Sequence, residues 1–360
     1  MSGGAPRDPV IIIGAGPAGL AAAERLSKRR IDYVILEKGR SVASALRRVD
    51  PQMRLLSPKG LSLMPDMRIA SNAPVYLPFE TLVHELERYQ QQHGLKVQLK
   101  SAVHSVRRDR NGFLVQYRIR GVEEAEIRGS HVINATGIIS RKRLPENFNP
   151  AKTTLHWLHS LDVRAEHLAK PRKLLVIGGG ASAAEVLENW LRVRGQNHLA
   201  YLSLRSRLRA FPHWILGIDV HYFAWLPEQL PAGLCGPVLN NLSEPMTGLT
   251  VVRAIRRGLI KKTPAVRRFE NGTVEFEDRK HLQPDLIVFA TGFNYALDHL
   301  AGLLDVDADG RPIVRNCEST RAPGLFLLGF RFGRTFASPY LRGIARDAEY
   351  VASRIAREKR

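Results

Sequence analysis

Two stretches of the chain pass from a strand-like to a helix-like pattern of hydrophobic positions in the same way. At residues 10–13 and 174–177 a short apolar run leads into clustered glycines, and apolar positions with helical spacing follow. An apolar run of this length next to glycine is typical of a buried strand in a parallel sheet, and the segment behind it is typical of a helix. The repeat therefore predicts two α/β units of one kind.

The remaining pattern extends both units. Helices are expected at residues 18–29, 79–92, 182–194 and 339–357, and strands at 32–36, 96–99, 102–107, 113–120, 124–127, 130–135, 199–204 and 286–289. Five prolines between residues 41 and 78 predict a long loop there. An Ala-Thr-Gly triplet ends one strand in each unit, at 135–137 and at 290–292. We predict an α/β fold of two Rossmann-like doubly wound domains, the second (169–283) inserted into the first (1–168 and 284–360).

The first glycine cluster has the spacing that binds a dinucleotide. Gly14 permits the tight turn, Gly16 lets the backbone approach a pyrophosphate, and Gly19 lets helix and strand pack closely. The helix behind it directs free N–H groups and the positive end of its dipole at the phosphates. The next strand ends at Glu37, 23 positions after Gly14, where a carboxylate can accept hydrogen bonds from ribose hydroxyls. These residues predict a dinucleotide with free ribose hydroxyls.

The second glycine cluster is followed by a different chemistry. It contains Gly178, Gly180 and Ser182, with Ala183 at the third glycine position, which this type of turn permits. The strand that follows ends at Arg205-Ser206-Arg207 and carries no carboxylate there. Two guanidiniums and a hydroxyl would attract the 2′-phosphate that a carboxylate would repel. We therefore predict NADPH at this turn; the alternative is that the two arginines only decorate a solvated strand end.

Composition limits the class of protein and its compartment. A chain of 360 residues with 44% hydrophobic residues is long enough for two globular domains with ordinary cores. No apolar run reaches the length of a membrane span. The two cysteines, Cys235 and Cys317, fit a reducing compartment, so we expect a cytoplasmic protein.

The net charge of +20, from 54 basic and 34 acidic residues, would also suit a protein that binds nucleic acid. The basic residues are spread over the whole chain, however, and aromatic residues do not alternate with them. This distribution favours a solvated basic surface that attracts anionic cofactors. A nucleotide-sensing module that binds nucleic acid is the less favoured alternative.

Taken together, these features resemble the flavin-containing monooxygenases and their bacterial relatives, which bind two dinucleotides. The resemblance extends over nearly the whole chain and includes both glycine turns, both Ala-Thr-Gly triplets and the stretches 50–58, 155–163 and 324–329. It implies FAD at the first turn, NADPH at the second, and a reaction in which reduced FAD and O2 oxygenate a small-molecule substrate. It also implies cofactor contacts at Pro17, Ala18, Lys38, Arg48, Val103, Ala135, Thr136, Gly137, Thr291, Gly292 and Gly329.

Departures from the family leave a second activity open. Phe330 follows Gly329 where the family has an aspartate, and the residues before His156 and His159 do not match the monooxygenase fingerprint. A reductase or dehydrogenase that passes electrons to a quinone or a protein partner is therefore kept as an alternative. A disulfide reductase is disfavoured because the two cysteines lie 82 positions apart and form no CxxC pair.

Few side chains are candidates for the chemistry itself, as expected where a cofactor carries it out. His159 is the one catalytic candidate, with packing as the favoured role. His213 and His221 belong to an aromatic stretch that could wall a substrate pocket. No metal site is expected, because the histidines show no HxH or HExxH spacing. Homo-oligomerisation is compatible with the sequence.

Overall fold

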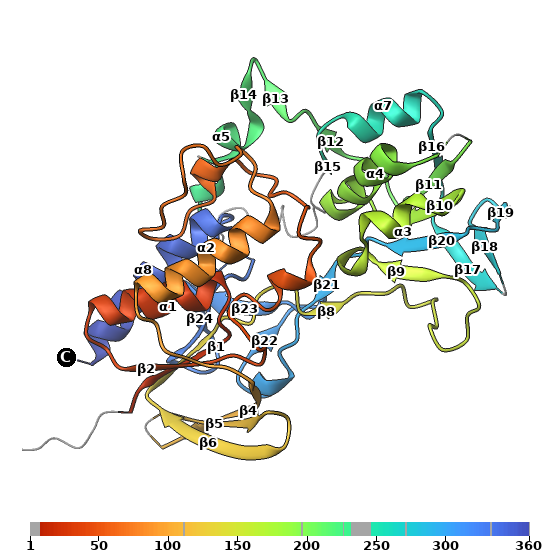
Figure 1. The fold of residues 1–360 in the computed structure, drawn as a ribbon. Helices are drawn as coiled ribbons and strands as arrows, with labels where there is room; N and C mark the ends of the chain where they lie inside the picture. Colours follow the sequence, from red (N-terminus) through yellow and green to blue (C-terminus); the bar gives the residue numbers. More distant parts are fainter. Residues whose placement is uncertain are drawn as a thin grey trace, which may run out of the picture.

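The structure is a computed structural model that describes residues 8–359 apart from 111, 196, 226, 232–245, 271 and 332. Figure 1 shows two lobes. The first lobe carries both ends of the described chain, and the second lobe is formed by the middle of the chain. They are joined by a narrow ribbon in which β8 (Arg141–Lys142) pairs antiparallel with β21 (Phe293–Asn294). The chain therefore crosses between the lobes on two neighbouring strands.

The first lobe is built on an eight-stranded sheet with the strand order β22-β23-β24-β25-β7-β1-β2-β3. Its strands are β1 (Val10–Ile13), β2 (Tyr33–Leu36), β3 (Val97–Gln98), β7 (His131–Asn134), β22 (Asp305–Val306), β23 (Pro312–Arg315), β24 (Glu318–Ser319) and β25 (Leu325–Leu327). The central strand β1 is buried at all four positions and runs parallel to both of its neighbours. Burial on both faces explains why its sequence is continuously apolar rather than alternating.

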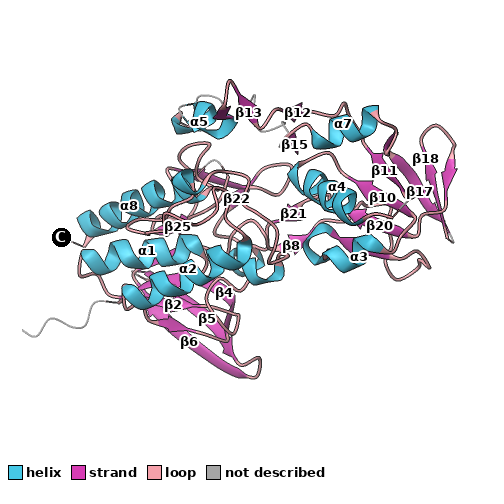
Figure 2. Ribbon diagram, turned by 45° about the horizontal axis from the view of Figure 1, so that its top comes forward, coloured by secondary structure: helices cyan, strands magenta, loops and turns pink. Residues whose placement is uncertain are grey.

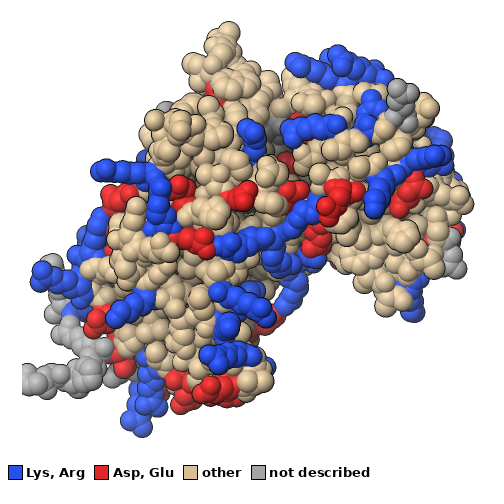
Figure 3. Space-filling model, in the orientation of Figure 1, with Lys and Arg blue, Asp and Glu red and all other residues tan. Residues whose placement is uncertain are grey.

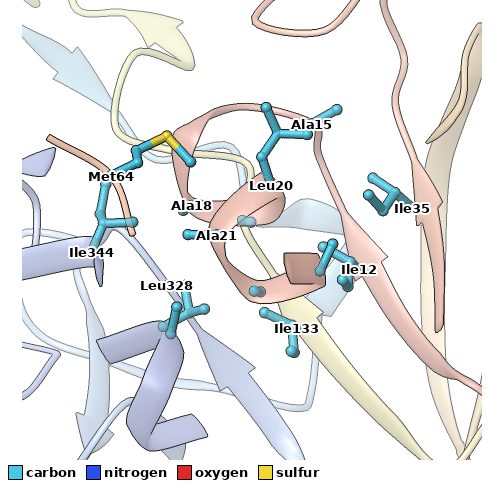
Figure 4. Close-up of a cluster of buried hydrophobic side chains, with 14 of the residues drawn as sticks. Ile12, Ala15, Ala18, Leu20, Ala21, Ile35, Met64, Ile133, Leu328 and Ile344 are labelled. Carbon is cyan, nitrogen blue, oxygen red and sulfur yellow. The ribbon is translucent and has the colours of Figure 1, made fainter. Parts of the chain in front are cut away.

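Helices α1 (Pro17–Lys28) and α8 (Leu341–Glu358) pack together against this sheet, and α2 (Phe79–Gln92) adds to the same layer. Figure 4 shows Ala18 and Ala21 of α1 between the sheet residue Ile133 on one side and Ile344 of α8 on the other. Small side chains on α1 let its backbone approach the sheet closely. The 3₁₀ helices η1 (Leu46–Arg48), η2 (Lys59–Leu61) and η5 (Asp298–Leu300) lie in the loops of this lobe.

The second lobe is built on a five-stranded parallel sheet with the order β16-β11-β10-β20-β9. The strands are β9 (Trp157–His159), β10 (Lys173–Ile177), β11 (Leu199–Ser203), β16 (Ile260–Thr263) and β20 (Leu286–Phe289). Figure 2 shows the helices of this lobe gathered near the sheet; they are α3 (Ala165–Ala169), α4 (Ala181–Val193) and α7 (Thr250–Arg256), with the 3₁₀ helix η3 (Ser160–Asp162) next to β9.

Alternate residues of β10 supply the cores on its two faces. Leu174 and Val176 pack with α4, whereas Leu175 and Ile177 pack with a three-stranded antiparallel sheet on the other face. That sheet consists of β17 (Val266–Glu270), β18 (Thr273–Phe276) and β19 (His281–Leu282). The alternation follows from the two-residue period of a strand.

A three-stranded antiparallel sheet covers the other face of the first lobe. Its strands are β4 (Ser101–Asp109), β5 (Gly112–Ile119) and β6 (Glu123–Gly129). Phe113 and Val115 from β5 pack there with Ile11 and Val132 of the eight-stranded sheet. This sheet closes the core on the face opposite α1 and α8.

A segment of the second lobe reaches across to the first lobe, and we call residues 212–231 the arm. It follows β12 (Ala210–Phe211), which pairs with β15 (Met246–Thr247), and it contains β13 (Trp214–Ile215), β14 (Ile218–Asp219), α5 (Val220–Trp225) and η4 (Pro227–Gln229). Arg342 of α8 pairs with Glu228 of the arm, with 2.6 Å between Nη2 and Oε1. Pro231 forms a β-bridge with Thr335. Figure 1 shows the arm above α2 and α8.

Most predicted elements are confirmed. The helix expected at residues 79–92 is α2 with the same bounds, and the bounds of the other three helices agree within two residues. The predicted α/β class, with one parallel-sheet unit inserted into another, is confirmed by the two sheets. None of the helices among the described residues has the length and hydrophobicity that crossing a bilayer requires.

The expected domain boundaries, at 168/169 and 283/284, need correction. They assign β9 and β20 to the first domain, yet both strands hydrogen-bond within the second sheet. β20 pairs with β10 along its whole length and is buried at all four positions. Sequence order alone suggested that the chain had already returned to the first lobe at residue 284, whereas it returns only after β20.

Candidate dinucleotide-binding sites

The first glycine turn has the geometry that its spacing predicts. Gly14 follows β1 with φ +103°, a conformation that favours glycine, and a Cβ there would lie 2.7 Å from the carbonyl oxygen of Ala135. A Cβ on Gly19 would lie 1.9 Å from the carbonyl oxygen of Gly14. Around Gly16, by contrast, a Cβ would meet no atom within 4 Å. The turn is therefore tightly packed at its two ends and open in the middle, where a pyrophosphate is expected to bind.

Glu37 is held beside this turn by the backbone. Its side chain is 6% exposed; Oε2 accepts a hydrogen bond from Ala15 N at 2.8 Å, and Oε1 accepts one from Gly39 N at 2.6 Å. A carboxylate has about four lone-pair positions, so two remain after these bonds. Because Ala15 lies within the turn, the bonds place the carboxylate beside the turn, on the side where a ribose is expected.

Other residues expected at the first site also lie at this edge of the sheet. Pro17 and Ala18 begin α1, and a Cβ on Gly329 would lie 3.2 Å from Cβ of Ala18. Ala135 donates its N–H to Ile13 O at 2.8 Å, which places the triplet 135–137 next to the turn. Within that triplet Thr136 Oγ1 is buried and has no hydrogen-bond partner among the described residues, so it is a polar atom with capacity for a ligand.

The remaining first-site candidates lie further out. Lys38 and Arg48 are exposed, and Arg48 ends η1. Val103 lies in β4 at a register irregularity, two residues after Ser101, whose N–H donates to the carbonyl oxygen of Glu37. This places Val103 near Glu37, on the side of the turn where the ribose is expected. The contacts of these three residues with FAD stay predictions.

The second glycine turn repeats the first in its packing. Gly178 follows β10 with φ +132°, and a Cβ there would lie 2.2 Å from the carbonyl oxygen of Ala290. Gly180 is the N-cap of α4, in extended conformation and without a side-chain cap. Ser182 lies in the first turn of α4, and Ala183 is buried at its base. In each lobe the glycine turn thus packs against the alanine that begins an Ala-Thr-Gly triplet.

One residue after the end of β11, the chain continues with three exposed residues: Arg205, Ser206 and Arg207. Within the described part of the chain, neither guanidinium has an ion-pair partner. Ser203, the last residue of β11, accepts the N–H of Gly178 at 3.2 Å, which ties the end of that strand to the glycine turn. Two unpaired guanidiniums after β11 can bind a phosphate on the ribose by charge-assisted hydrogen bonds.

Both turns face the connecting ribbon between the lobes. β8 begins at Arg141, seven residues after β7 ends at Asn134, and β21 begins at Phe293, four residues after β20 ends at Phe289. The carboxyl ends of β7 and β20 therefore lead into the same pair of strands. In open α/β sheets, ligands bind at the carboxyl ends of the strands.

His159 lies at this junction, but its ring is occupied by backbone groups. It is fully buried; Nε2 lies 3.0 Å from the carbonyl oxygen of Gly292, and Nδ1 accepts the N–H of Leu161 at 3.2 Å. Burial lowers the pKa of His159, so the ring is neutral at pH 7. His159 ends strand β9, and His156, just before that strand, is exposed. This geometry favours the packing role of His159 over a catalytic one.

Thr291 and Gly292 are part of the same junction. Thr291 Oγ1 donates a hydrogen bond to the carbonyl oxygen of Arg143, and Gly292 O accepts the N–H of Arg143 at 3.0 Å. Gly292 has φ +81°, which favours glycine at this position. Arg164 of the second lobe also donates from Nη2 to the carbonyl oxygen of Arg48 in the first lobe at 2.8 Å. Hydrogen bonds therefore join the two lobes beside the connecting ribbon.

The structure groups three side chains of the arm in a way that the sequence did not predict. His213, Asp219 and His221 carry possible ligand atoms that all lie within 4.8 Å of one another. Their spacing matches no short metal motif, and only the hairpin of β13 and β14 brings them together. Leu216-Gly217, a glycine-containing two-residue turn between apolar residues, was the signal that could have predicted this hairpin.

The chain matches the model of a known family, described as pyridine nucleotide-disulphide oxidoreductase, over residues 11–202. The matched region begins in β1 and ends in β11, so it contains both glycine turns and the acidic strand end at Glu37. The match thus covers the elements that form the two sites described above.

Individual proteins agree with this result. CzcO of Bacillus velezensis, described as an uncharacterized oxidoreductase, is 24% identical over 350 residues, which cover 96% of this chain and 98% of the relative. YUCCA9 of Arabidopsis thaliana, described as a probable indole-3-pyruvate monooxygenase, is 28% identical over 318 residues, which cover 79% of this chain and 74% of the relative.

Among solved structures, a flavin-containing monooxygenase from Stenotrophomonas maltophilia superimposes with a TM-score of 0.78 at 23% identity, covering 99% of this chain and 100% of that one. The fold predicted from the two glycine turns is thereby confirmed, and so is the resemblance to flavin monooxygenases. The chain belongs to the pyridine nucleotide-disulphide oxidoreductase family and is an oxidoreductase.

Proposed function

We propose that the protein is an FAD-dependent oxidoreductase that consumes NADPH and inserts one atom of O2 into a small-molecule substrate. The observation that carries the proposal is the pair of open glycine turns that face one connecting ribbon, with opposite charges beside them. Glu37 lies beside the first turn, and Arg205 and Arg207 follow the strand beside the second. A carboxylate suits free ribose hydroxyls, whereas guanidiniums suit a 2′-phosphate.

The first lobe would hold FAD. The N–H groups at the start of α1 would bind its pyrophosphate over Gly16, where the space is open, and Glu37 would accept hydrogen bonds from its ribose. When bound, FAD supplies the redox chemistry with NADPH and O2. The protein's own contribution is to orient the cofactors and to exclude water from the junction.

The second lobe would hold NADPH. The start of α4 after Gly180 offers N–H groups to the pyrophosphate, and Arg205, Ser206 and Arg207 would contact the 2′-phosphate. Figure 3 shows Lys and Arg scattered over both lobes and mixed with acidic residues on the face drawn. This distribution supports general attraction of anionic cofactors and gives no support on that face to a continuous nucleic-acid-binding stripe.

The substrate we propose is a small molecule with a soft nucleophilic atom, such as a thioether sulfur or an amine nitrogen, or with a reactive carbonyl. Similarity to flavin monooxygenases supports oxygenation. The proposed location is the cytoplasm, which the low cysteine content supports.

The rival function is a reductase that passes electrons to a quinone or a protein without oxygenating anything. Phe330 after Gly329, in place of the aspartate of monooxygenases, favours keeping this rival. The disulfide-reducing branch of the family is disfavoured. Cys317 is fully buried, burial raises the pKa of its thiol, and little reactive thiolate can form. The other cysteine, Cys235, lies outside the described residues.

Measured electron balance distinguishes the two functions. The purified, FAD-loaded protein should oxidise NADPH faster when a suitable thioether or amine is added, and each NADPH should yield one O2 consumed and one oxygenated product. Release of peroxide without product, together with rapid NADPH-dependent reduction of a quinone, would support the reductase and exclude the proposal. A panel of sulfur, nitrogen and carbonyl substrates makes the comparison complete.

Glu37→Ala should weaken FAD binding about 10- to 100-fold, because the ribose loses its charged acceptor. The flavin content of the purified protein, measured from its absorbance, checks this. The FAD affinity of Glu37→Gln should lie between those of the wild type and Glu37→Ala, because the glutamine amide oxygen can still accept one hydrogen bond. Glu126→Ala, at an exposed position on β6 of the same lobe, is the matched control. A Glu37→Ala protein that retains a full complement of FAD on dilution would contradict the role of this carboxylate.

A further inference from the structure

The base of the arm hairpin holds an unusual group of side chains. Asp219 is 2% exposed; its Oδ1 lies 2.8 Å from Nδ1 of His221, and its Oδ2 lies 3.3 Å from Nε2 of His213. Nε2 of His213 is buried and has no hydrogen-bond partner among the described residues. An imidazole nitrogen buried next to a carboxylate without a hydrogen bond is a polar group that a ligand could satisfy.

The hairpin explains why these residues meet. Trp214 pairs with Asp219 across β13 and β14, so His213 and His221 flank the same end of the ribbon. The connecting turn is Leu216-Gly217, with φ +50° and +76°, as in the tight turns that join two antiparallel strands. The three side chains are therefore brought together by local structure, within nine residues of chain.

We propose that His213, Asp219 and His221 bind a divalent transition-metal ion, for which Zn²⁺ is the probe. Two imidazoles and one carboxylate form a ligand set that Zn²⁺ accepts, and the fourth position is left for water. Tetrahedral bonds of about 2.0–2.2 Å keep ligand atoms about 3.3–3.6 Å apart. The 3.3 Å between His213 Nε2 and Asp219 Oδ2 matches this spacing, and all three ligand atoms lie within 4.8 Å of one another. The 2.8 Å between His221 Nδ1 and Asp219 Oδ1 is a hydrogen bond, which a bound ion would replace with a wider separation.

The surroundings already orient the carboxylate. Tyr76, from the loop of the first lobe, donates its hydroxyl hydrogen to Asp219 Oδ2, and the backbone N–H of His221 donates to Oδ1 at 2.8 Å. These two hydrogen bonds hold the carboxylate in place, and Tyr76 is a partner outside the ligand set, as is usual for the residues that orient metal ligands.

The position of the site gives the ion a structural task. Its three ligands belong to the arm, and Tyr76 belongs to the first lobe, so a bound ion would stiffen the hairpin at the point where the two lobes touch. The ring of Tyr76 also packs edge-on against His213, with 4.9 Å between the ring centroids. The inference does not depend on FAD, NADPH or oxygenation.

A titration of the chelator-stripped, full-length protein with Zn²⁺, in competition with a chromogenic chelator, tests the site. We expect one equivalent to bind tightly and to raise the melting temperature. Loss of a residue that orients a metal ligand weakens metal binding roughly 10- to 100-fold, and Tyr76→Phe should fall within that range. His213→Ala and His221→Ala each remove a ligand, so each should weaken Zn²⁺ binding by more than that. His84→Ala, at a 67% exposed position on α2, is the control and should bind as the wild type does.

Two results would overturn the proposal. One is wild-type binding of clearly less than one equivalent; the other is equal affinity in the wild type and in the His213→Ala and His221→Ala variants. Circular dichroism of each variant shows whether it folds. If one alanine variant does not fold, the remaining variant and Tyr76→Phe still decide, because Phe keeps the ring that packs against His213.

Discussion

Gly16→Ala should weaken FAD binding about 100-fold or more and leave the protein folded. A methyl group at Gly16 meets no protein atom within 4 Å, so the fold has no reason to change. The same methyl group would occupy the space in which the backbone approaches the pyrophosphate, where two charge-assisted hydrogen bonds contribute about 3 kcal/mol together. Equilibrium dialysis of FAD and thermal unfolding of the apoprotein measure the two effects separately.

Gly19→Ala is the matched counterpart, with the opposite expectation. Its Cβ would lie 1.9 Å from the carbonyl oxygen of Gly14, so α1 must shift from the sheet. Overpacking of this kind lowers the free energy of unfolding by about 2 kcal/mol, even though alanine favours helix. The apoprotein should therefore melt earlier. If Gly16→Ala destabilised the apoprotein and Gly19→Ala did not, the geometry assigned to this turn would be wrong.

Replacing Arg205 and Arg207 together by alanine should raise the KM for NADPH about 100-fold and leave the KM for NADH unchanged. Each guanidinium is exposed and, among the described residues, unpaired, so its loss exposes no buried partner. A charge-assisted hydrogen bond to a phosphate is worth about 1.5 kcal/mol, or about tenfold in affinity, and there are two of them. Steady-state kinetics with both nucleotides measures the change in preference.

The control for this variant is a pair of arginines of similar exposure in the same lobe. Arg256 is the last residue of α7 and Arg257 is its C-cap, and both are exposed. Their replacement by alanine removes the same net charge, so it should change both KM values slightly and equally through the general field. Equal loss of NADPH preference in the two double variants would show that net charge, and not position, selects the nucleotide.

The parts of the fold that the sequence predicted well are those with strong local patterns. The amphipathic helix α2 agrees with its expected bounds, and β1 and β10 are recognisable because continuous apolar runs end in glycine. The roles of Gly14 and Gly19 could be predicted because each position has room for no side chain: Gly14 in a tight turn, and Gly19 where helix and strand pack closely. Those roles agree with the contacts that a Cβ would make.

The parts that the sequence could not predict depend on contacts between distant segments. β20 reads as a buried strand in either lobe, and only its pairing with β10 assigns it to the second sheet. A catalytic role for His159 could not be ruled out from the sequence. Its burial and its hydrogen bond with Gly292 depend on residues far away in the chain. The arm was expected only as an irregular aromatic stretch, because its anchors, Arg342 and Thr335, lie more than 100 residues further along the chain.

The arm has a mechanical consequence for the molecule. A ribbon of two strands acts as a hinge, about which two rigid bodies can rotate. The arm adds a brace at a second point, because Glu228 is paired with Arg342 and Asp219 is bonded to Tyr76. Swinging the lobes apart about the ribbon must therefore break both attachments or bend the arm. Any movement that separates the two glycine turns therefore costs the free energy of these contacts.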